Sequence, residues 1–202
     1  EDTNEMLLGE VVPPGIFLKA AEVLRRQMFA FCLDDWVGSG IPDTALPDKT
    51  KEALDARDSL DQTRFPYTFL DYVQTHEERL LEGFKALLGA DLNDRVAIRL
   101  QGFMQGTDKD NALRLRLSKL VEELAKERKA HQERGKQIKK QINTLKAGPQ
   151  DEATKNEIDH LERERQKTIE LVKEINQREL LNTLIPVREA IETELRSVLN
   201  AG

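Results

Sequence analysis

The strongest constraint on the fold is a seven-residue repeat in the second half of the chain. Leucine, isoleucine or histidine stands at Leu117, Leu124, His131, Ile138 and Leu145. Such a repeat keeps one edge of an α-helix aligned, and an apolar edge of this kind packs against another helix. No proline interrupts residues 112–146. The repeat therefore predicts one unbroken helix, which at about 1.5 Å per residue is about 50 Å long.

The residues directly after this helix predict a sharp turn. Ala147-Gly148-Pro149-Gln150 breaks the helical pattern, and Asp151 can cap the next helix. A short connection of this kind places two helices antiparallel to each other. Residues 107–202 are therefore predicted to form an antiparallel coiled-coil hairpin with its turn at 147–151.

The returning helix carries aliphatic residues at a comparable spacing. They are Ile158, Leu161, Val172, Ile175, Leu184, Ile191, Leu195 and Val198. If Leu145 pairs with Ile158, His131 lies opposite Val172. Pro186 falls inside an otherwise helical pattern and should kink it, because proline removes a hydrogen bond and clashes with the preceding turn. The last turns are expected to return to the first half of the chain, or to pack on a second copy.

The first half of the chain predicts a small helical head over residues 13–106. Helical spacing of apolar residues and turn signals predict helices over 16–37, 49–60, 66–89 and 91–106, the last one capped by Asp91. Residues 1–12 are acidic and lack periodicity, so we expect a mobile tail there. No stretch alternates as a strand would. The predicted fold is all-α and elongated, because 39% hydrophobic and 34% charged residues suit helices with much solvated surface.

Positive charge concentrates in one part of the chain. Residues 107–150 hold 12 Lys and Arg against 6 Asp and Glu, although the whole chain has a net charge of −6. The cations that form this excess lie between residues 126 and 146: Lys126, Arg128, Lys129, Arg134, Lys136, Lys139, Lys140 and Lys146. An anionic partner should meet this stretch first. The plainer alternative is that acidic residues of the facing helix simply pair with these side chains: Glu157, Asp159, Glu162 and Glu164.

Other residues with potential chemistry form no recognisable site. Cys32 lies in the most apolar predicted helix without an adjacent base, which is typical of a buried structural cysteine. Glu157 and His160 have the spacing of a carboxylate-bundle metal motif, but the sequence has no second such pair. We therefore expect no catalytic residue, no metal and no cofactor.

The sequence favours a non-enzymatic protein-interaction or scaffold module that oligomerises or holds partners through helical surfaces. Its expected interface residues lie near the carboxyl end: Leu184, Ile185, Ile191, Leu195 and Val198. The alternative is a peripheral membrane module that uses the basic residues 126–146 and resembles BAR-type proteins in architecture only. A third possibility, the regulatory subunit of an enzyme, would require a polar pocket in the head.

Composition also suggests a location and a class of partner. A single cysteine without a secretory signal predicts a reducing, cytoplasmic environment, with attachment to a membrane surface under the alternative function. The apolar runs are too short to span a bilayer. Nucleic acid is an unfavourable partner, because the chain is acidic overall and no aromatic residues lie between the lysines.

Overall fold

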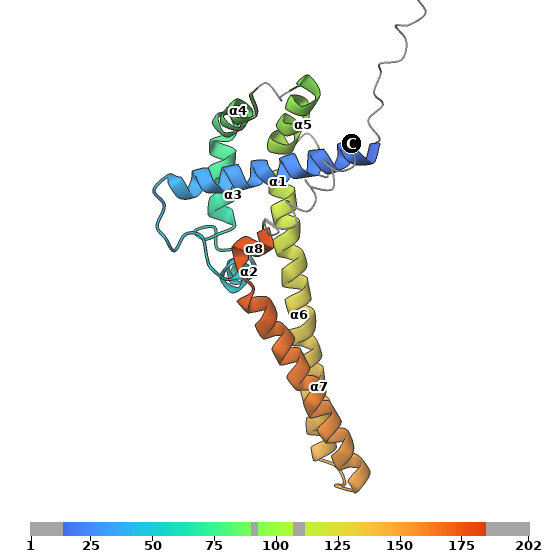
Figure 1. Ribbon diagram of the computed structural model, residues 1–202. Coiled ribbons are helices and arrows are strands. Elements are labelled where there is room, and N and C mark those ends of the chain that lie inside the picture. Colours follow the sequence, from blue (N-terminus) through green and yellow to red (C-terminus); the bar gives the residue numbers. More distant parts are fainter. Residues whose placement is uncertain (1–13, 90–92, 107–111, 185–202) are drawn as a thin grey trace, which may run out of the picture.

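A computed structural model describes residues 14–89, 93–106 and 112–184, with side chains described from residue 21 onward. Within these ranges the chain forms eight α-helices and no strand, which confirms the all-α prediction (Figure 1). The helices are α1 (Pro14–Gly38), α2 (Thr50–Ser59), α3 (Tyr67–Thr75), α4 (Glu77–Leu88), α5 (Asp94–Gln105), α6 (Leu113–Lys146), α7 (Glu152–Gln177) and α8 (Leu180–Leu184). None of these helices is long and apolar enough to cross a membrane.

Helix α1 runs across α3, α4 and α5 and supplies the centre of the main core. Its residues Met28 and Trp36 are buried together with Phe69 of α3, and the Trp36 and Phe69 ring centroids lie 5.4 Å apart. Aromatic rings bury large apolar areas and favour such tilted contacts.

Two details of the first half differ from the sequence-based expectation. The helix predicted over 66–89 is two helices, because it breaks at His76, whose backbone leaves the helical region at φ −112° and ψ 19°. The break lets α3 and α4 each pack on α1. The cap of α5 is Asn93, whose side chain accepts a hydrogen bond from the Val96 N–H at 2.9 Å. The predicted cap, Asp91, lies outside the described residues.

Helices α6 and α7 pack on each other extensively and project away from α1 (Figure 1). The turn between them lies where the sequence predicts it, and Asp151 accepts a hydrogen bond from the Thr154 N–H at 2.8 Å. The apolar contacts between the two helices form two groups. Near the body, Leu124 of α6 and Ile175 of α7 belong to the main core, whereas nearer the turn Ile138 belongs to a separate cluster with Ile142 and Ile158.

The main core therefore extends past residue 106, where the sequence pattern places the end of the head. It includes α6 as far as Ala125, and it is joined again by Ile175 of α7 and Leu180 of α8. We call residues 126–174 the arm and the remaining described residues the body. Helix α7 ends at Gln177 rather than continuing through Pro186. The predicted kink at Pro186 and the tail 1–12 lie outside the described residues.

Candidate functional site: a basic groove along the arm

The eight basic residues predicted to meet an anionic partner fall into three groups. Four of the exposed ones form ion pairs: Lys126 with Glu122, Lys136 with Glu133, Arg134 with Glu164, and Lys146 with Glu162. The last two pairs cross from α6 to α7, as the plainer reading of the charge predicts. Lys129, Lys139 and Lys140 have no ion pair within the described ranges. The remaining cation, Arg128, is buried.

Arg128 is a structural residue at the base of the arm. Its guanidinium donates hydrogen bonds to Asp55 Oδ1 at 2.9 Å, to Asp58 Oδ2 at 2.9 Å and to Asn176 Oδ1 at 3.0 Å. The side chain is only 6% exposed. Arg128 thus ties α6 to α2 and α7. The sequence had suggested that Arg128 contacts an external anionic surface, but its burial makes it unavailable for that contact.

The electrostatics of Asp55 reflect this contact. Burial raises the pKa of the Asp55 carboxyl, but hydrogen bonds from Lys51 and Arg128 outweigh burial and hold this pKa below its ordinary value of 3.8. Asp55 therefore stays ionised near neutral pH, and it continues to orient the Arg128 fork. The charge pair is an attachment between the arm and the body.

A short backbone pairing completes the attachment. The Thr50 N–H donates to the Arg178 carbonyl at 3.0 Å, and the Leu180 N–H donates to the Asp48 carbonyl at 2.9 Å. The Thr50 hydroxyl, which is buried, donates to the Ile175 carbonyl at the end of α7. These bonds satisfy backbone groups that the end of α7 leaves free. They fix the position of α7 relative to α2.

Two adjoining hollows, of about 540 and 400 Å³, share Ile169 and Val172 of α7 and form one open groove. The hollow nearer the turn is lined from α6 and α7 by His131, Gln132, Gly135, Lys136, Lys139, Arg165 and Thr168. The hollow nearer the body is lined by Lys49, Lys51, Glu52, Lys173, Asn176 and Gln177. We call this combined surface the arm groove.

A close approach of the two helices lies beneath the arm groove. A Cβ atom added to Gly135 of α6 would lie 2.9 Å from Thr168 Oγ1 of α7, a distance that real Cβ contacts do not show. The Thr168 side chain is buried, and its hydroxyl donates to the Arg165 carbonyl at 2.7 Å. Glycine at position 135 therefore brings the helices together where the groove has its floor.

The arm groove combines an apolar floor with a basic rim. Ile169 is 45% exposed, and Val172 beside it is partly exposed. The lining of the arm groove holds six Lys and Arg side chains and one carboxylate, that of Glu52. Of the six, four have no ion pair within the described part of the chain: Lys49, Lys139, Arg165 and Lys173. This surface places an exposed aliphatic strip between cations that have no ion pair among the described residues.

Sequence reasoning found only part of this site. Lys136 and Lys139 belong to the predicted basic stretch, whereas Arg165, Ile169 and Lys173 of α7 were missed. The signal for them was present, since these three residues recur at four-residue intervals and so share one helix face. The contribution of Lys49 depends on the tertiary packing of α2 against the arm.

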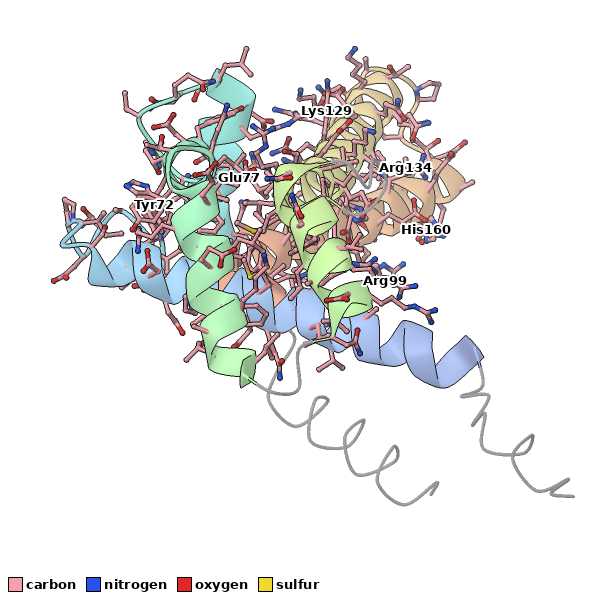
Figure 2. All side chains as sticks on the ribbon, turned by 90° about the horizontal axis from the view of Figure 1, so that it is seen from above. Tyr72, Glu77, Arg99, Lys129, Arg134 and His160 are labelled. Atoms are coloured by element: carbon pink, nitrogen blue, oxygen red, sulfur yellow. The ribbon has the colours of Figure 1, made fainter. Side chains whose placement is uncertain are left out.

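A second polar cluster lies on the body, around Tyr72 of α3. The Tyr72 hydroxyl donates to Asp35 Oδ2 at 2.6 Å, and Arg79 donates to both Asp35 oxygens at 3.0 and 2.7 Å. An open hollow of about 470 Å³ adjoins Tyr72 and His76. Figure 2 places Tyr72 at one side of the molecule, well away from Lys129 and Arg134 of the arm. Asp35 already accepts three hydrogen bonds here. The cluster therefore has a structural role, because it links α1, α3 and α4.

The remaining candidate residues are isolated. Burial raises the pKa of the Cys32 thiol to about 12, so it stays protonated near neutral pH, as expected of a buried structural cysteine. His160 is 65% exposed and lies 3.6 Å from Glu164. Among the described residues, no three His, Cys, Asp or Glu side chains come close enough to hold a metal ion.

The predicted interface near the carboxyl end falls mostly outside the described residues. Leu184 is partly buried against the main core. Ile185, Ile191, Leu195 and Val198 are not described. In α8, Leu181 is 50% exposed.

Comparison of the chain with known protein families, with curated proteins and with solved structures finds no match.

Proposed function

We propose that this protein is a non-enzymatic interaction module, a scaffold whose arm binds a protein partner in the arm groove. The observation that carries the proposal is the arm groove itself, in which Ile169 and Val172 form an exposed apolar strip between unpaired cations. Exposed apolar surface with a polar rim is typical of protein-binding sites.

The proposal includes the shape of the molecule. We infer that α6 and α7 form an antiparallel coiled-coil hairpin that makes the protein elongated. Support comes from contacts that advance along α6 while they retreat along α7: Arg128 with Asn176, Gly135 with Thr168, and Lys146 with Glu162. A seam of heptad residues between such helices is the geometry of a coiled coil. An elongated arm would hold a partner at a fixed distance from the body.

Attachment at the base of the arm supports a scaffold rather than a loose tether. Arg128 is buried against two carboxylates of α2, and the backbone of residues 48–50 pairs with residues 178–180. Three segments far apart in the sequence meet at this point. A partner bound on the arm would thus have a defined orientation relative to the body.

A peripheral membrane module is the second candidate, and one observation favours it. Lys129 and Lys140 are exposed, form no ion pair among the described residues beyond a longer-range interaction with Glu133, and do not line the arm groove. Their charge would suit an anionic lipid surface. The groove favours a protein partner instead, because apolar side chains of a protein could cover Ile169 and Val172, whereas charged lipid headgroups would not. A regulatory subunit of an enzyme is the third candidate, and its polar pocket would be the hollow beside Tyr72.

Site-specific photo-cross-linking in cells tests the proposed function. Benzoylphenylalanine replaces Ile169 inside the groove, and in a matched control it replaces Leu171, which is 40% exposed on a different face of α7. We expect a discrete protein adduct from position 169 alone, lost when Lys139 and Lys173 are changed to Glu. Equal adducts from both positions, or none, would contradict the proposal.

Light scattering after size exclusion and co-sedimentation with vesicles separate the alternatives. A dimer that is lost in Lys139→Glu/Lys173→Glu would make the partner a second copy of this chain. Salt-sensitive binding to vesicles rich in anionic phospholipid, abolished by Lys129→Glu/Lys140→Glu, would support the membrane module.

A further inference from the structure

We infer that the partner segment held in the arm groove is an acidic amphipathic α-helix. This inference rests on the proposed function and specifies the chemistry of its partner. Three features of the groove carry it: a straight track along α7, a floor that offers side chains rather than backbone groups, and unpaired cations on both sides.

The track follows one face of α7. Arg165, Ile169, Val172, Lys173 and Asn176 lie at intervals of three, four or one residue and all line the groove. From Arg165 to Asn176 the helix rises about 16 Å, or about three turns. This length matches the contact that a partner helix of three to four turns makes when it lies alongside.

The floor favours a helix over an extended peptide. Helices α6 and α7 use their own backbone hydrogen bonds along the arm, so the groove presents side chains such as Ile169 and Val172. An extended peptide would leave its backbone N–H and C=O groups without protein partners, whereas a helix satisfies them internally. Leucine-type side chains on one face of that helix would cover the aliphatic strip.

The basic side chains around the groove indicate that the partner segment is negatively charged. Lys139 and Lys136 stand on the α6 side, Lys49 stands on the α2 side, and Arg165 and Lys173 lie on α7 itself. Glu or Asp residues that flank an apolar stripe would meet these cations while the stripe meets Ile169. Polyanions without an apolar face, including nucleic acid, would leave the strip uncovered, and among the residues that line the groove only His131 carries a ring that could stack on a base.

A designed peptide tests the inference with the full-length protein. The probe is a fluorescein-labelled peptide of about four turns, with leucines on one face and glutamates elsewhere. Its controls are a scrambled peptide of the same composition and a peptide with lysine in place of glutamate. Fluorescence anisotropy should show binding of the probe about tenfold tighter than binding of the scrambled peptide. The lysine peptide should not bind.

Matched protein variants locate the binding site. Lys139→Glu/Lys173→Glu should weaken probe binding about tenfold or more, whereas Lys129→Glu/Lys140→Glu, with the same change of net charge outside the groove, should weaken it less than about threefold. Ile169→Ser should weaken it without a change in salt dependence. Far-ultraviolet circular dichroism and the thermal midpoint establish that each variant remains folded.

The outcomes separate this inference from the proposed function. Equal affinity for the probe and the scrambled peptide, or equal losses in both charge variants, would overturn the acidic helix. If the probe does not bind but Ile169 still cross-links to a protein, the partner has another chemistry and the interaction module stands. If neither experiment succeeds, both proposals fall.

Discussion

Arg128 of α6 donates a hydrogen bond to Asp55 of α2 at 2.9 Å, and this contact joins the arm to the body. Two further bonds, to Asp58 and Asn176, leave the guanidinium 6% exposed. A buried cation is tolerated only when its donors are paired. The same residue belongs to a basic stretch that by sequence alone reads as a binding surface, which shows how burial separates a structural cation from the exposed ones beside it.

Replacing Arg128 with alanine should destabilise the protein by about 2 kcal/mol, because it removes three charge-assisted hydrogen bonds. The cost stays below that of a fully buried pair, since Asp55 and Asp58 are 37% and 49% exposed and regain water. Urea unfolding measures the change. Arg134→Ala is the matched control, because Arg134 is 54% exposed with one pair to Glu164, and should cost about 0.5 kcal/mol or less. Equal losses would mean that Arg128 does not anchor the arm.

The second apolar cluster predicts that the outer part of the arm opens independently. Ile138 is 1% exposed and packs with Ile142 and Ile158, apart from the main core. Ile138→Ala should cost about 3 kcal/mol through lost contacts and a cavity. Hydrogen exchange measured by mass spectrometry should speed up between residues 136 and 165 and stay unchanged in α1 and α3. Uniformly faster exchange would show that the arm and the body unfold together.

The cluster of Asp35, Tyr72 and Arg79 predicts how stability depends on pH. The hydrogen bond from Arg79 is the main reason that the pKa of Asp35 lies below its ordinary value of 3.8. Burial, followed by the hydrogen bond to Asp35, raises the pKa of Tyr72 above its ordinary value of 10.0. The two shifts have opposite consequences for proton binding.

A carboxyl with a lowered pKa binds fewer protons in the folded state, so its stabilising contribution is present above pH 3.8 and is lost as the pH falls. A phenol with a raised pKa binds more protons in the folded state, so its contribution is present below pH 10.0 and is lost as the pH rises. We expect Asp35→Asn to flatten the acid decline of the unfolding free energy. Tyr72→Phe should flatten the alkaline decline and, because the Tyr72 hydrogen bond also lowers the pKa of Asp35, should reduce the acid decline to a smaller extent. Unchanged pH profiles in both variants would contradict the assignment.

Local sequence signals sufficed for the elements whose boundaries are set within the chain itself. Gly106 ends α5 with a left-handed backbone at φ 75°, and Asp151 begins α7 with a side-chain cap. The heptad residues Leu117, Leu124 and Ile138 are all buried, as the repeat predicts. Glycine conformations, caps and periodicity are local, so the sequence expresses them directly.

Boundaries set by tertiary packing were not predictable in this way. The helix break at His76 involves neither proline nor glycine, and it coincides with the packing of α3 and α4 on α1. The end of α7 at Gln177 is fixed by Thr50 and Asp48, more than a hundred residues earlier in the chain. The helical spacing of apolar residues in the sequence continues through both His76 and Gln177. The contribution of Lys49 to the arm groove was missed for the same reason, because Lys49 reaches the groove only through the fold.

The account depends most on the register in which α7 lies against α6, since that register creates the arm groove. Gly135 and Thr168 provide the sharpest test, because a Cβ at position 135 would lie 3.8 Å from Thr168 Cβ. That separation is typical of a disulfide. Cys32 is buried with a thiol pKa of about 12 and should not compete. The matched control pairs Gly135→Cys with Lys167→Cys, one residue away on an exposed face.

The decisive measurement is peptide mapping by mass spectrometry of oxidised Gly135→Cys/Thr168→Cys. The account predicts a cross-link within one chain between positions 135 and 168, formed readily under mild oxidation, and little or none in the control pair. An absent cross-link, one that forms equally in both pairs, or one that joins only separate chains would contradict the packing of α7 on α6 and remove the arm groove with it.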